Sequence, residues 1–283
     1  MATLREIRRK LQSVTNIEKI TQAMEMVAAS RLRKAQARAE MSRPYARKLK
    51  EILERLVVVT DHFAHPLLNK REVKKIGVVV VSGDKGLCGS YNQMVFSRTE
   101  KFLRNYSQDQ AELILVGQKG IEYFANKKWK ANPRIATWGG KITYGEIAAF
   151  TEELMDRYVA EEFDEIWIIY THFVNAAVRQ VKVEKLLPIE NPKIEEHIKK
   201  VPYIFEPCVP EIFKALLPKY CITQVQSALY ESYASELAAR VFSMRAATKN
   251  AEEMIEKLTL VRNKVRQSGI TRELIEITAT LDR

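Results

Sequence analysis

The sequence predicts a small α/β domain flanked by two long terminal helices that pair as a left-handed antiparallel coiled coil. The first observation is the distribution of glycine, which marks turns because it adopts positive φ at no steric cost. Nine of the ten glycines lie from Gly77 to Gly145, and the tenth is Gly269. The second observation is that apolar residues have helical spacing towards both ends of the chain and strand-like spacing between them.

The N-terminal helix is expected over about residues 3–58. Its apolar residues recur in steps of three and four, the spacing of one helix face. They are Leu4, Ile7, Leu11, Val14, Ile17, Ile20, Met24 and Val27, and, after an alanine-rich stretch, Met41, Tyr45, Leu49, Ile52 and Leu56. The alanines would let a neighbouring helix approach closely. Pro44 predicts a local bend or the loss of one backbone hydrogen bond.

The middle of the chain alternates between predicted strands and helices, which favours a small, parallel or mixed, Rossmann-like sheet. The expected strands are 76–82, 112–116, 165–173 and 178–187, and the expected helices are 92–105, 118–126 and 144–159. A proline-bearing connector over 191–210, with a short strand at 203–206, would lead into the last helix.

The C-terminal helix is expected over about residues 210–277. Its apolar seam spans 21 residues in six steps, and the mean step of 3.5 residues predicts a left-handed supercoil. The seam residues are Leu237, Val241, Met244, Thr248, Ala251, Ile255 and Leu258. Neither terminal helix can bury its apolar face alone, so the simplest partner of each is the other. A homo-oligomeric helix bundle is the alternative.

The net charge of +11 is concentrated at the N-terminus, where residues 1–60 hold 14 Lys and Arg against 6 Asp and Glu. This charge favours an acidic protein partner, nucleic acid or anionic lipid. No apolar run approaches the roughly 20 residues of a membrane span, and no secretory signal is expected. Cys88, Cys208 and Cys221 form no CxxC pair, so we expect reduced thiols that pack as small apolar side chains.

A turn with three glycines, Gly83, Gly86 and Gly89, lies between a predicted strand and a predicted helix. Its GxxGxxG spacing fits neither the dinucleotide-binding motif nor the phosphate loop, so we expect a tight turn with an exposed Lys85. Asp84 is expected to form an ion pair within this turn. The four histidines have no neighbouring cysteine, and no catalytic, cofactor-binding or metal-binding residue is predicted.

Four runs lie in order along the chain: IEKITQAMEMVAASRLRKAQ at 17–36, SGDKGLCGSYN at 82–92, SELAARVFSMRAATKNAEEMI at 235–255 and RNKVRQSGITRELIEI at 262–277. Together they resemble the gamma subunit of the bacterial F-type rotary ATP synthase over almost the full length. The chain lacks the cysteine-bearing insertion of the chloroplast members. Its tail, 278–283, departs from the Gly-Ala-containing end that is usual in this family.

The resemblance implies a central rotor shaft that catalyses nothing itself and needs no cofactor. Residues 1–60 and 210–283 would form one coiled coil inside the hexameric ring of alpha and beta subunits, and the α/β domain, 74–206, would lie beside the epsilon subunit and the membrane c-ring. Rotation driven by proton flow would pass through this shaft. Association with the cytoplasmic face of the bacterial cell membrane would then be indirect, through the c-ring, and nucleic acid would not be a partner.

The resemblance also implies a set of protein-contact residues. Those expected near acidic loops of the beta subunits are Met24, Arg31, Arg33 and Lys34. Those expected near the base of the shaft are Lys85 and Cys88, and the C-terminal contact positions are Arg240, Arg266, Gln267 and Thr271. Two other function classes stay open on the residues alone. One is a basic coiled-coil scaffold for nucleic acid or anionic membrane, and the other is a nucleotide-binding α/β enzyme that depends on the glycine turn.

Overall fold

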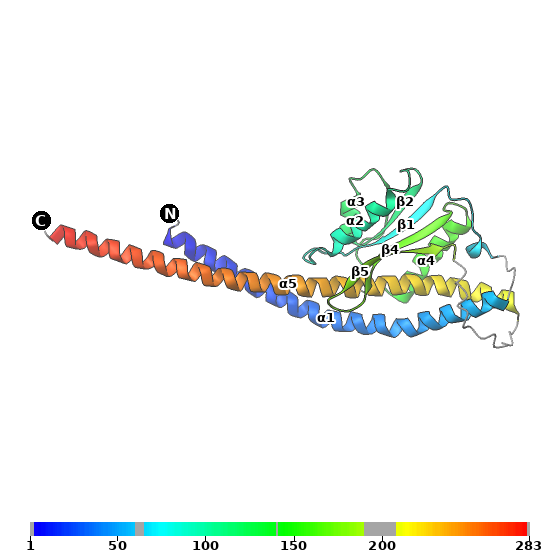
Figure 1. Ribbon diagram of the computed structural model, residues 1–283, viewed down its shortest axis with the longest axis horizontal. Helices are drawn as coiled ribbons and strands as arrows, with labels where there is room; N and C mark the ends of the chain where they lie inside the picture. Colours follow the sequence, from blue (N-terminus) through cyan, green and yellow to red (C-terminus); the bar gives the residue numbers. More distant parts are fainter. Residues whose placement is uncertain (1–2, 60–64, 140, 190–207, 282–283) are drawn as a thin grey trace. The chain divides into compact units, whose positions relative to one another are not determined.

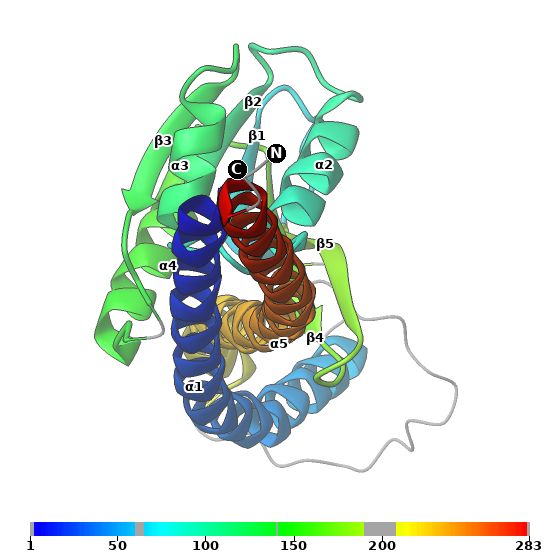
Figure 2. The same cartoon turned by 90° about the vertical axis from the view of Figure 1, so that its left-hand side faces the viewer.

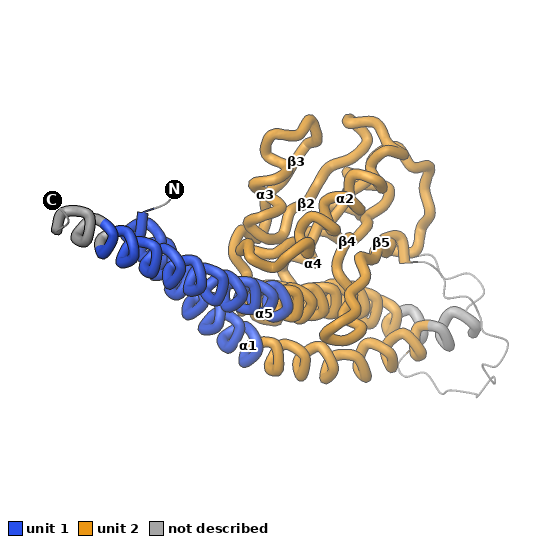
Figure 3. Tube along the Cα trace, turned by 60° about the vertical axis from the view of Figure 1, so that its left-hand side comes forward, with its two compact units in different colours: residues 1–30, 240–283 blue, residues 31–239 orange. Residues whose placement is uncertain are grey.

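The computed structural model describes residues 3–59, 65–139, 141–189 and 208–281. Two long helices dominate it, α1 (Leu4–Val59) and α5 (Val209–Leu281) (Figure 1). The chain divides into two compact units, residues 1–30 with 240–283 and residues 31–239 (Figure 3). Each unit contains a segment of both helices. The predicted strand at 203–206, and the connector up to residue 207, lie outside the described residues.

The second unit contains a five-stranded mixed sheet in the order β3-β2-β1-β4-β5. Its strands are β1 (Ile76–Val81), β2 (Ala111–Val116), β3 (Lys130–Ile135), β4 (Glu165–Phe173) and β5 (Arg179–Leu187). Strand β1 pairs in parallel with β2 and β4, and β2 pairs in parallel with β3, whereas β5 runs antiparallel to β4. The expected small mixed sheet is therefore confirmed.

The described part of this unit also contains three shorter helices and one 3-10 turn: α2 (Tyr91–Leu103), α3 (Gln118–Phe124), α4 (Tyr144–Val159) and η1 (Pro66–Leu68). The sequence fixes the start of α4 through a capping box. The Thr143 hydroxyl accepts the backbone N–H of Glu146 at 3.3 Å, and the Glu146 carboxylate accepts the backbone N–H of Thr143 at 2.7 Å.

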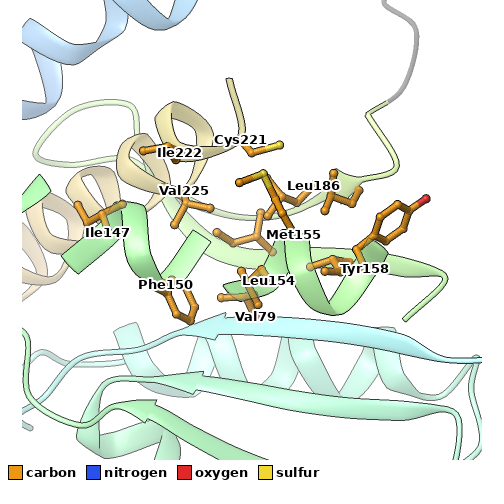
Figure 4. Close-up of a cluster of buried hydrophobic side chains, with 14 of the residues drawn as sticks. Val79, Ile147, Phe150, Leu154, Met155, Tyr158, Leu186, Cys221, Ile222 and Val225 are labelled. Atoms are coloured by element: carbon orange, nitrogen blue, oxygen red, sulfur yellow. The ribbon is translucent and has the colours of Figure 1, made fainter. Parts of the chain in front are cut away.

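Strand β1 supplies side chains to both faces of the sheet because successive residues of a strand point in opposite directions. Ile76, Val78 and Val80 pack with α2 and α3, and Val79 and Val81 pack on the other face with α4 (Figures 1 and 2). Helix α5 lies on the same face as α4, where its buried side chains complete the core (Figure 4). These α5 residues are Phe213, Leu217, Cys221, Ile222, Val225, Ala228 and Leu229.

In the first unit, α1 and α5 run antiparallel, with Thr21 against Thr248 and Glu25 against Arg245. The predicted α5 seam is confirmed where it is buried, at Val241, Met244, Thr248 and Ala251.

The predicted stripe on α1 is partly wrong. The buried residues of this part of α1 follow a seven-residue repeat: Ile7, Val14, Thr21 and Ala28. Ile17, Ile20 and Val27, which the prediction placed on the same face, are 51%, 59% and 52% exposed. The prediction followed the bulky apolar residues, which is correct at Ile7 and Val14. From there the buried seam passes to the smaller Thr21 and Ala28.

The same correction applies to α1 in the second unit. Ala35, Ala39, Leu49 and Leu53 are buried there. Met41, Tyr45 and Ile52, which were also expected on the buried stripe, are exposed. Helix α1 continues through Pro44, and α5 continues through Pro218.

Two further predictions need correction. Strand β3 was not predicted, because its side chains are half-buried or exposed and it contains Pro133, which sheets tolerate only at an edge. The three cysteines do not share one environment. Cys88 and Cys221 are buried, as expected, whereas Cys208, which lies just before the start of α5, is exposed.

Candidate functional site

The glycine turn after β1 is closely covered by helix α5. The backbone N–H of Gly83 donates to Asn92 Oδ1 at 2.9 Å, which closes the turn onto the start of α2. A Cβ atom at Gly83 would lie 2.9 Å from Cδ and 3.1 Å from Oε2 of Glu236, a buried residue of α5. The Glu236 side chain of α5 therefore lies directly beside the first glycine of the turn.

Asp84 organises the loops around this turn. Its Oδ2 accepts the backbone N–H groups of Trp138 at 3.0 Å and Gly139 at 2.6 Å, and its Oδ1 accepts that of Gln118 at 3.4 Å. The predicted ion pair between Asp84 and Lys85 is wrong, because the Asp84 carboxylate accepts hydrogen bonds from three backbone N–H groups instead. Lys85 is exposed, as predicted.

Cys88 and Tyr91 form a small buried cluster with Ala239 of α5. The Cys88 thiol donates to the backbone oxygen of Lys85 at 3.7 Å and accepts from Asn92 Nδ2 at 3.4 Å. The Tyr91 hydroxyl donates to the backbone oxygen of Ser232 at 3.1 Å. Burial, and then the nearby charge of Glu236, raise the pKa of Tyr91 far above its ordinary value, so its hydroxyl remains a donor.

The carboxyl end of β4 is hydrogen-bonded to two serines of α5. The backbone N–H of Thr171 donates to Ser232 Oγ at 3.1 Å, and Ser235 Oγ donates to the backbone oxygen of Thr171 at 3.2 Å. Both serines are completely buried. Sequence reasoning missed these residues. The signal available was the placing of two serines, Ser232 and Ser235, between Glu231 and Glu236 in a part of α5 whose preceding turns are buried.

The next two residues of β4 also contact the long helices. His172 Nδ1 lies against the carboxylate of Glu231 on α5. The guanidinium of Arg43 on α1 donates to the backbone oxygen of Phe173 at 2.7 Å and to Glu231 Oε1 at 3.4 Å. Glu231 is buried, and its carboxylate is contacted by one group from the sheet and one from α1.

This arrangement fills the place where open α/β sheets usually bind ligands. Such sites lie at the carboxyl ends of the strands, at the point where the strand order reverses. Here β2 and β3 lie on one side of β1, and β4 and β5 lie on the other. Ser232, Ser235 and Glu236 of α5 occupy the space beside the ends of β1 and β4. The carboxylate of Glu236 beside Gly83 would also repel a phosphate, which argues against the nucleotide-binding interpretation of the turn.

Some of the predicted contact residues lie in the same element of the structure. Arg31, Arg33 and Lys34 are exposed on one stretch of α1 and form no ion pair within the described part of the chain. Lys85 and Cys88 belong to one turn, in which Lys85 is exposed and Cys88 is buried.

The other contact residues lie in the first unit. Met24 and Arg240 are half-buried, whereas Arg266, Gln267 and Thr271 are exposed on α5. Thr271 Oγ1 donates to the backbone oxygen of Gln267 at 2.9 Å, so these two residues share one helix face.

The described ranges also bear on membrane and metal sites. Within these ranges, no helix is long and apolar enough to cross a membrane. No group of three or more His, Cys, Asp or Glu side chains that could hold a metal ion occurs among the residues whose structure is described.

Comparison with known proteins gives consistent matches along the chain. A family model described as ATP synthase matches residues 3–282. The ATP synthase gamma chain of Protochlamydia amoebophila is 53% identical over 279 residues, which cover 99% of this chain and 98% of the relative. That of Desulfitobacterium hafniense is 42% identical over 277 residues, which cover 98% of this chain and 97% of the relative.

Solved structures agree with these relatives. The fold is similar to a chain of the Tetrahymena thermophila mitochondrial ATP synthase, in a structure of its central stalk and c-ring, with a TM-score of 0.61 and 26% identity. That match covers 81% of this chain and 99% of the other. A chain of the Euglena gracilis mitochondrial ATP synthase shares the fold with a TM-score of 0.68 at 17% identity, over 99% and 93% of the two chains. The chain therefore belongs to the ATP synthase gamma chain family.

Proposed function

We propose that this chain is the central rotor of a proton-translocating ATP synthase and transmits rotation between the membrane c-ring and the catalytic ring of alpha and beta subunits. The structural observation that carries the proposal is the double role of α5. In the second unit α5 is a core helix of the α/β domain, and in the first unit it is the partner of α1.

The side chains of α5 are suited to transmitting torque. Phe213, Leu217 and Cys221 are buried under the sheet, and Met244 and Thr248 are buried in the first unit. A force that turns the sheet therefore acts on α5 through close-packed side chains, which have little room to yield. Helix α5 contains no glycine before Gly269, and each glycine avoided spares a helix roughly 1 kcal/mol of destabilisation relative to alanine.

We propose that catalysis belongs to other subunits. The support is that α5 fills the place at the carboxyl ends of the strands where an α/β enzyme would bind its ligand. Glu236 and Ser232 would have to move before a nucleotide could enter beside Gly83.

The predicted contact residues are proposed as interfaces with the other subunits. Arg31, Arg33 and Lys34 present exposed cations to acidic loops of the beta subunits. Met24, Arg240, Arg266, Gln267 and Thr271 are proposed as further contact positions with the ring. Lys85 would contact the lower loops of the ring directly, whereas Cys88 is buried and would act by packing the turn that carries Lys85.

The α/β domain is proposed to lie beside the epsilon subunit and the c-ring. The chain would then associate with the cytoplasmic face of the bacterial cell membrane only through the c-ring.

Reconstitution tests this function. The chain is mixed with separately purified alpha and beta subunits, and the mixture is analysed by size-exclusion chromatography and an ATPase assay, with alpha and beta alone as the control. We expect one copy per hexameric ring and a rise in steady ATP hydrolysis. Separate elution with unchanged hydrolysis would contradict the proposal, and binding to DNA and anionic vesicles would then test the basic-scaffold alternative.

A further inference from the structure

Three consecutive residues at the carboxyl end of β4 contact the two long helices. We name these residues, Thr171, His172 and Phe173, the β4 joint. Strand β1 pairs with β4 only as far as Ile169. Beyond that point no strand from the described ranges pairs with this edge of β4. Ser232 and Ser235 of α5 bond to the backbone N–H and oxygen of Thr171 there, so α5 takes the place of the missing strand.

The β4 joint also reaches α1. The Phe173 ring is buried in a cluster with Ala35 of α1 and with Ala234, Leu237 and Ala238 of α5. The Phe173 backbone oxygen accepts from Arg43, whose guanidinium also meets Glu231. His172 contacts the same Glu231 carboxylate. Each residue of the joint therefore contacts α5 through its backbone or its side chain, and Phe173 also contacts α1.

The polar contacts of the joint oppose rotation of α5 about its own axis, a motion that apolar packing opposes less well. Apolar burial is nondirectional, so it opposes the separation of a helix from a sheet more strongly than the rotation of the helix about its own axis. Hydrogen bonds weaken steeply when their geometry changes. Because Ser232 and Ser235 are completely buried, water cannot replace the bonds that such a rotation would break.

We propose that the β4 joint is the point at which torque passes between the α/β domain and the helix pair. Ser232 and Ser235 act as positioning residues that prevent α5 from turning against the sheet. The Tyr91 hydroxyl, bonded to the backbone oxygen of Ser232, adds a third attachment from the first residue of α2. This inference rests on the proposed rotor function.

The test uses the complete ATP synthase in sealed vesicles and measures ATP-driven proton uptake and ATP hydrolysis on the same sample. In the Ser232→Ala/Ser235→Ala variant the Thr171 backbone groups lose their partners. We expect hydrolysis to persist while the ratio of proton uptake to hydrolysis falls to roughly half or less, because slippage dissipates rotation.

Thr99→Val is the matched control. Thr99 is also completely buried, and its hydroxyl bonds to the Val95 backbone oxygen at 2.8 Å within α2, outside the joint. The control should leave the ratio unchanged. Tyr91→Phe removes one bond while keeping the ring, and should lower the ratio less than the double serine variant does. It also provides a milder test should that variant fail to assemble.

A covalent rescue separates torque transfer from general stability. Cys88 and Ala239 lie in one buried cluster, so Ala239→Cys places a second thiol beside the native one. Oxidation with copper phenanthroline should then tie the turn to α5, restore the ratio in the double serine variant and leave it low without the Ala239→Cys substitution. Peptide mapping verifies the disulfide, and dithiothreitol should reverse the rescue.

The outcomes are distinct. An unchanged ratio in the assembled serine and tyrosine variants overturns the inference, as does an equal fall in Thr99→Val. A low ratio that persists after the mapped disulfide has formed also overturns it. If the unmodified enzyme shows no coupled proton uptake, the proposed rotor function itself fails instead.

Discussion

Thr21 of α1 and Thr248 of α5 face each other in a buried seam, with their hydroxyl oxygens 2.8 Å apart. Each hydroxyl also lies within hydrogen-bonding distance of a carbonyl of its own helix, at Glu18 and Met244. Two hydroxyl protons are thus shared among three possible bonds. A polar pair in an otherwise apolar seam favours one register of the two helices, because any slip separates the hydroxyls.

A double-mutant cycle tests this pair. Thr21→Val and Thr248→Val keep the side-chain shape, and each is expected to cost about 1 kcal/mol of unfolding free energy. The double variant should cost less than the sum, because no hydroxyl is left without its partner. Equilibrium denaturation of the four proteins measures the coupling. Costs that add to within about 0.5 kcal/mol would contradict an interaction between the hydroxyls.

Gly117→Ala is expected to destabilise the α/β domain severely. Gly117 has φ 96°, and a Cβ atom there would lie 2.2 Å from the backbone oxygen of Ser82. Strain and clash together should cost about 3 kcal/mol or more and lower the melting temperature. Gly145→Ala is the control, because its Cβ meets nothing within 4 Å in the first turn of α4. It should be neutral or stabilising, and equal melting temperatures for the two variants would contradict the prediction.

Thiol labelling should distinguish the three cysteines. Cys208 is exposed, whereas Cys88 and Cys221 are buried. Burial raises the pKa of the Cys221 thiol to about 12, so almost no reactive thiolate exists there at pH 8. Iodoacetamide followed by mass spectrometry should give one adduct, at Cys208, in the native protein and three in denaturant. Rapid native labelling of Cys221 would show that the core around it opens.

Glu112 should contribute stability that depends on pH. It is buried and bonds to Arg157 at 2.8 Å, Lys130 at 2.7 Å and Asn132 at 3.2 Å. Burial alone would raise the pKa of Glu112, but these hydrogen bonds outweigh burial, so the pKa is lowered from 4.5. A lowered pKa contributes stability above the unfolded value, and this contribution disappears as the pH falls through the folded value.

Glu112→Gln tests this dependence. We expect a loss of about 3 kcal/mol at pH 7, because a buried ion pair is broken, and a shrinking difference from the parent as the pH falls below 4.5. Glu122→Gln, which removes an exposed carboxylate paired with Lys119, is the control and should change little. Denaturation curves at several pH values measure both variants. A difference that stays constant down to low pH would refute the assignment.

Reversal of charge on α1 tests the proposed ring contact. Arg33→Glu/Lys34→Glu should weaken ATP-driven proton pumping or assembly while the melting temperature is kept, because exposed substitutions usually change stability by within about 0.5 kcal/mol. Arg98→Glu/Lys101→Glu makes the same change of charge on exposed positions of α2. Pumping that is unchanged in the first variant, or reduced equally in both, would count against contact between α1 and acidic loops.

Local patterns made most of the fold predictable. Helix α4 and strand β4 match their predicted bounds, because the capping box starts α4 and a continuous apolar run defines β4. Strand β3 lacks such a pattern. It is held by pairing with β2, and its exposed side chains carry little information about that partner.

The candidate site was less predictable than the fold. The family resemblance pointed to exposed contact residues, but not to the β4 joint. Ser232 and Ser235 meet Thr171 across 61 and 64 residues of sequence, and no local spacing encodes such a pairing. The α1 seam was obscured for a different reason. Bulky residues such as Ile17 and Ile20 are exposed, while Thr21 and Ala28 are buried.

The use of α5 as a core helix also determines when the α/β domain can finish folding during synthesis. The sheet is complete once β5 has left the ribosome, yet one of its faces still lacks Phe213, Leu217 and Val225. Because domains generally fold as units during translation, the part of this face that α4 does not cover stays exposed until the C-terminal helix emerges. A nascent chain that stalls before α5 therefore exposes part of an apolar sheet face, which makes incomplete products targets for chaperones and proteases before they can enter a complex.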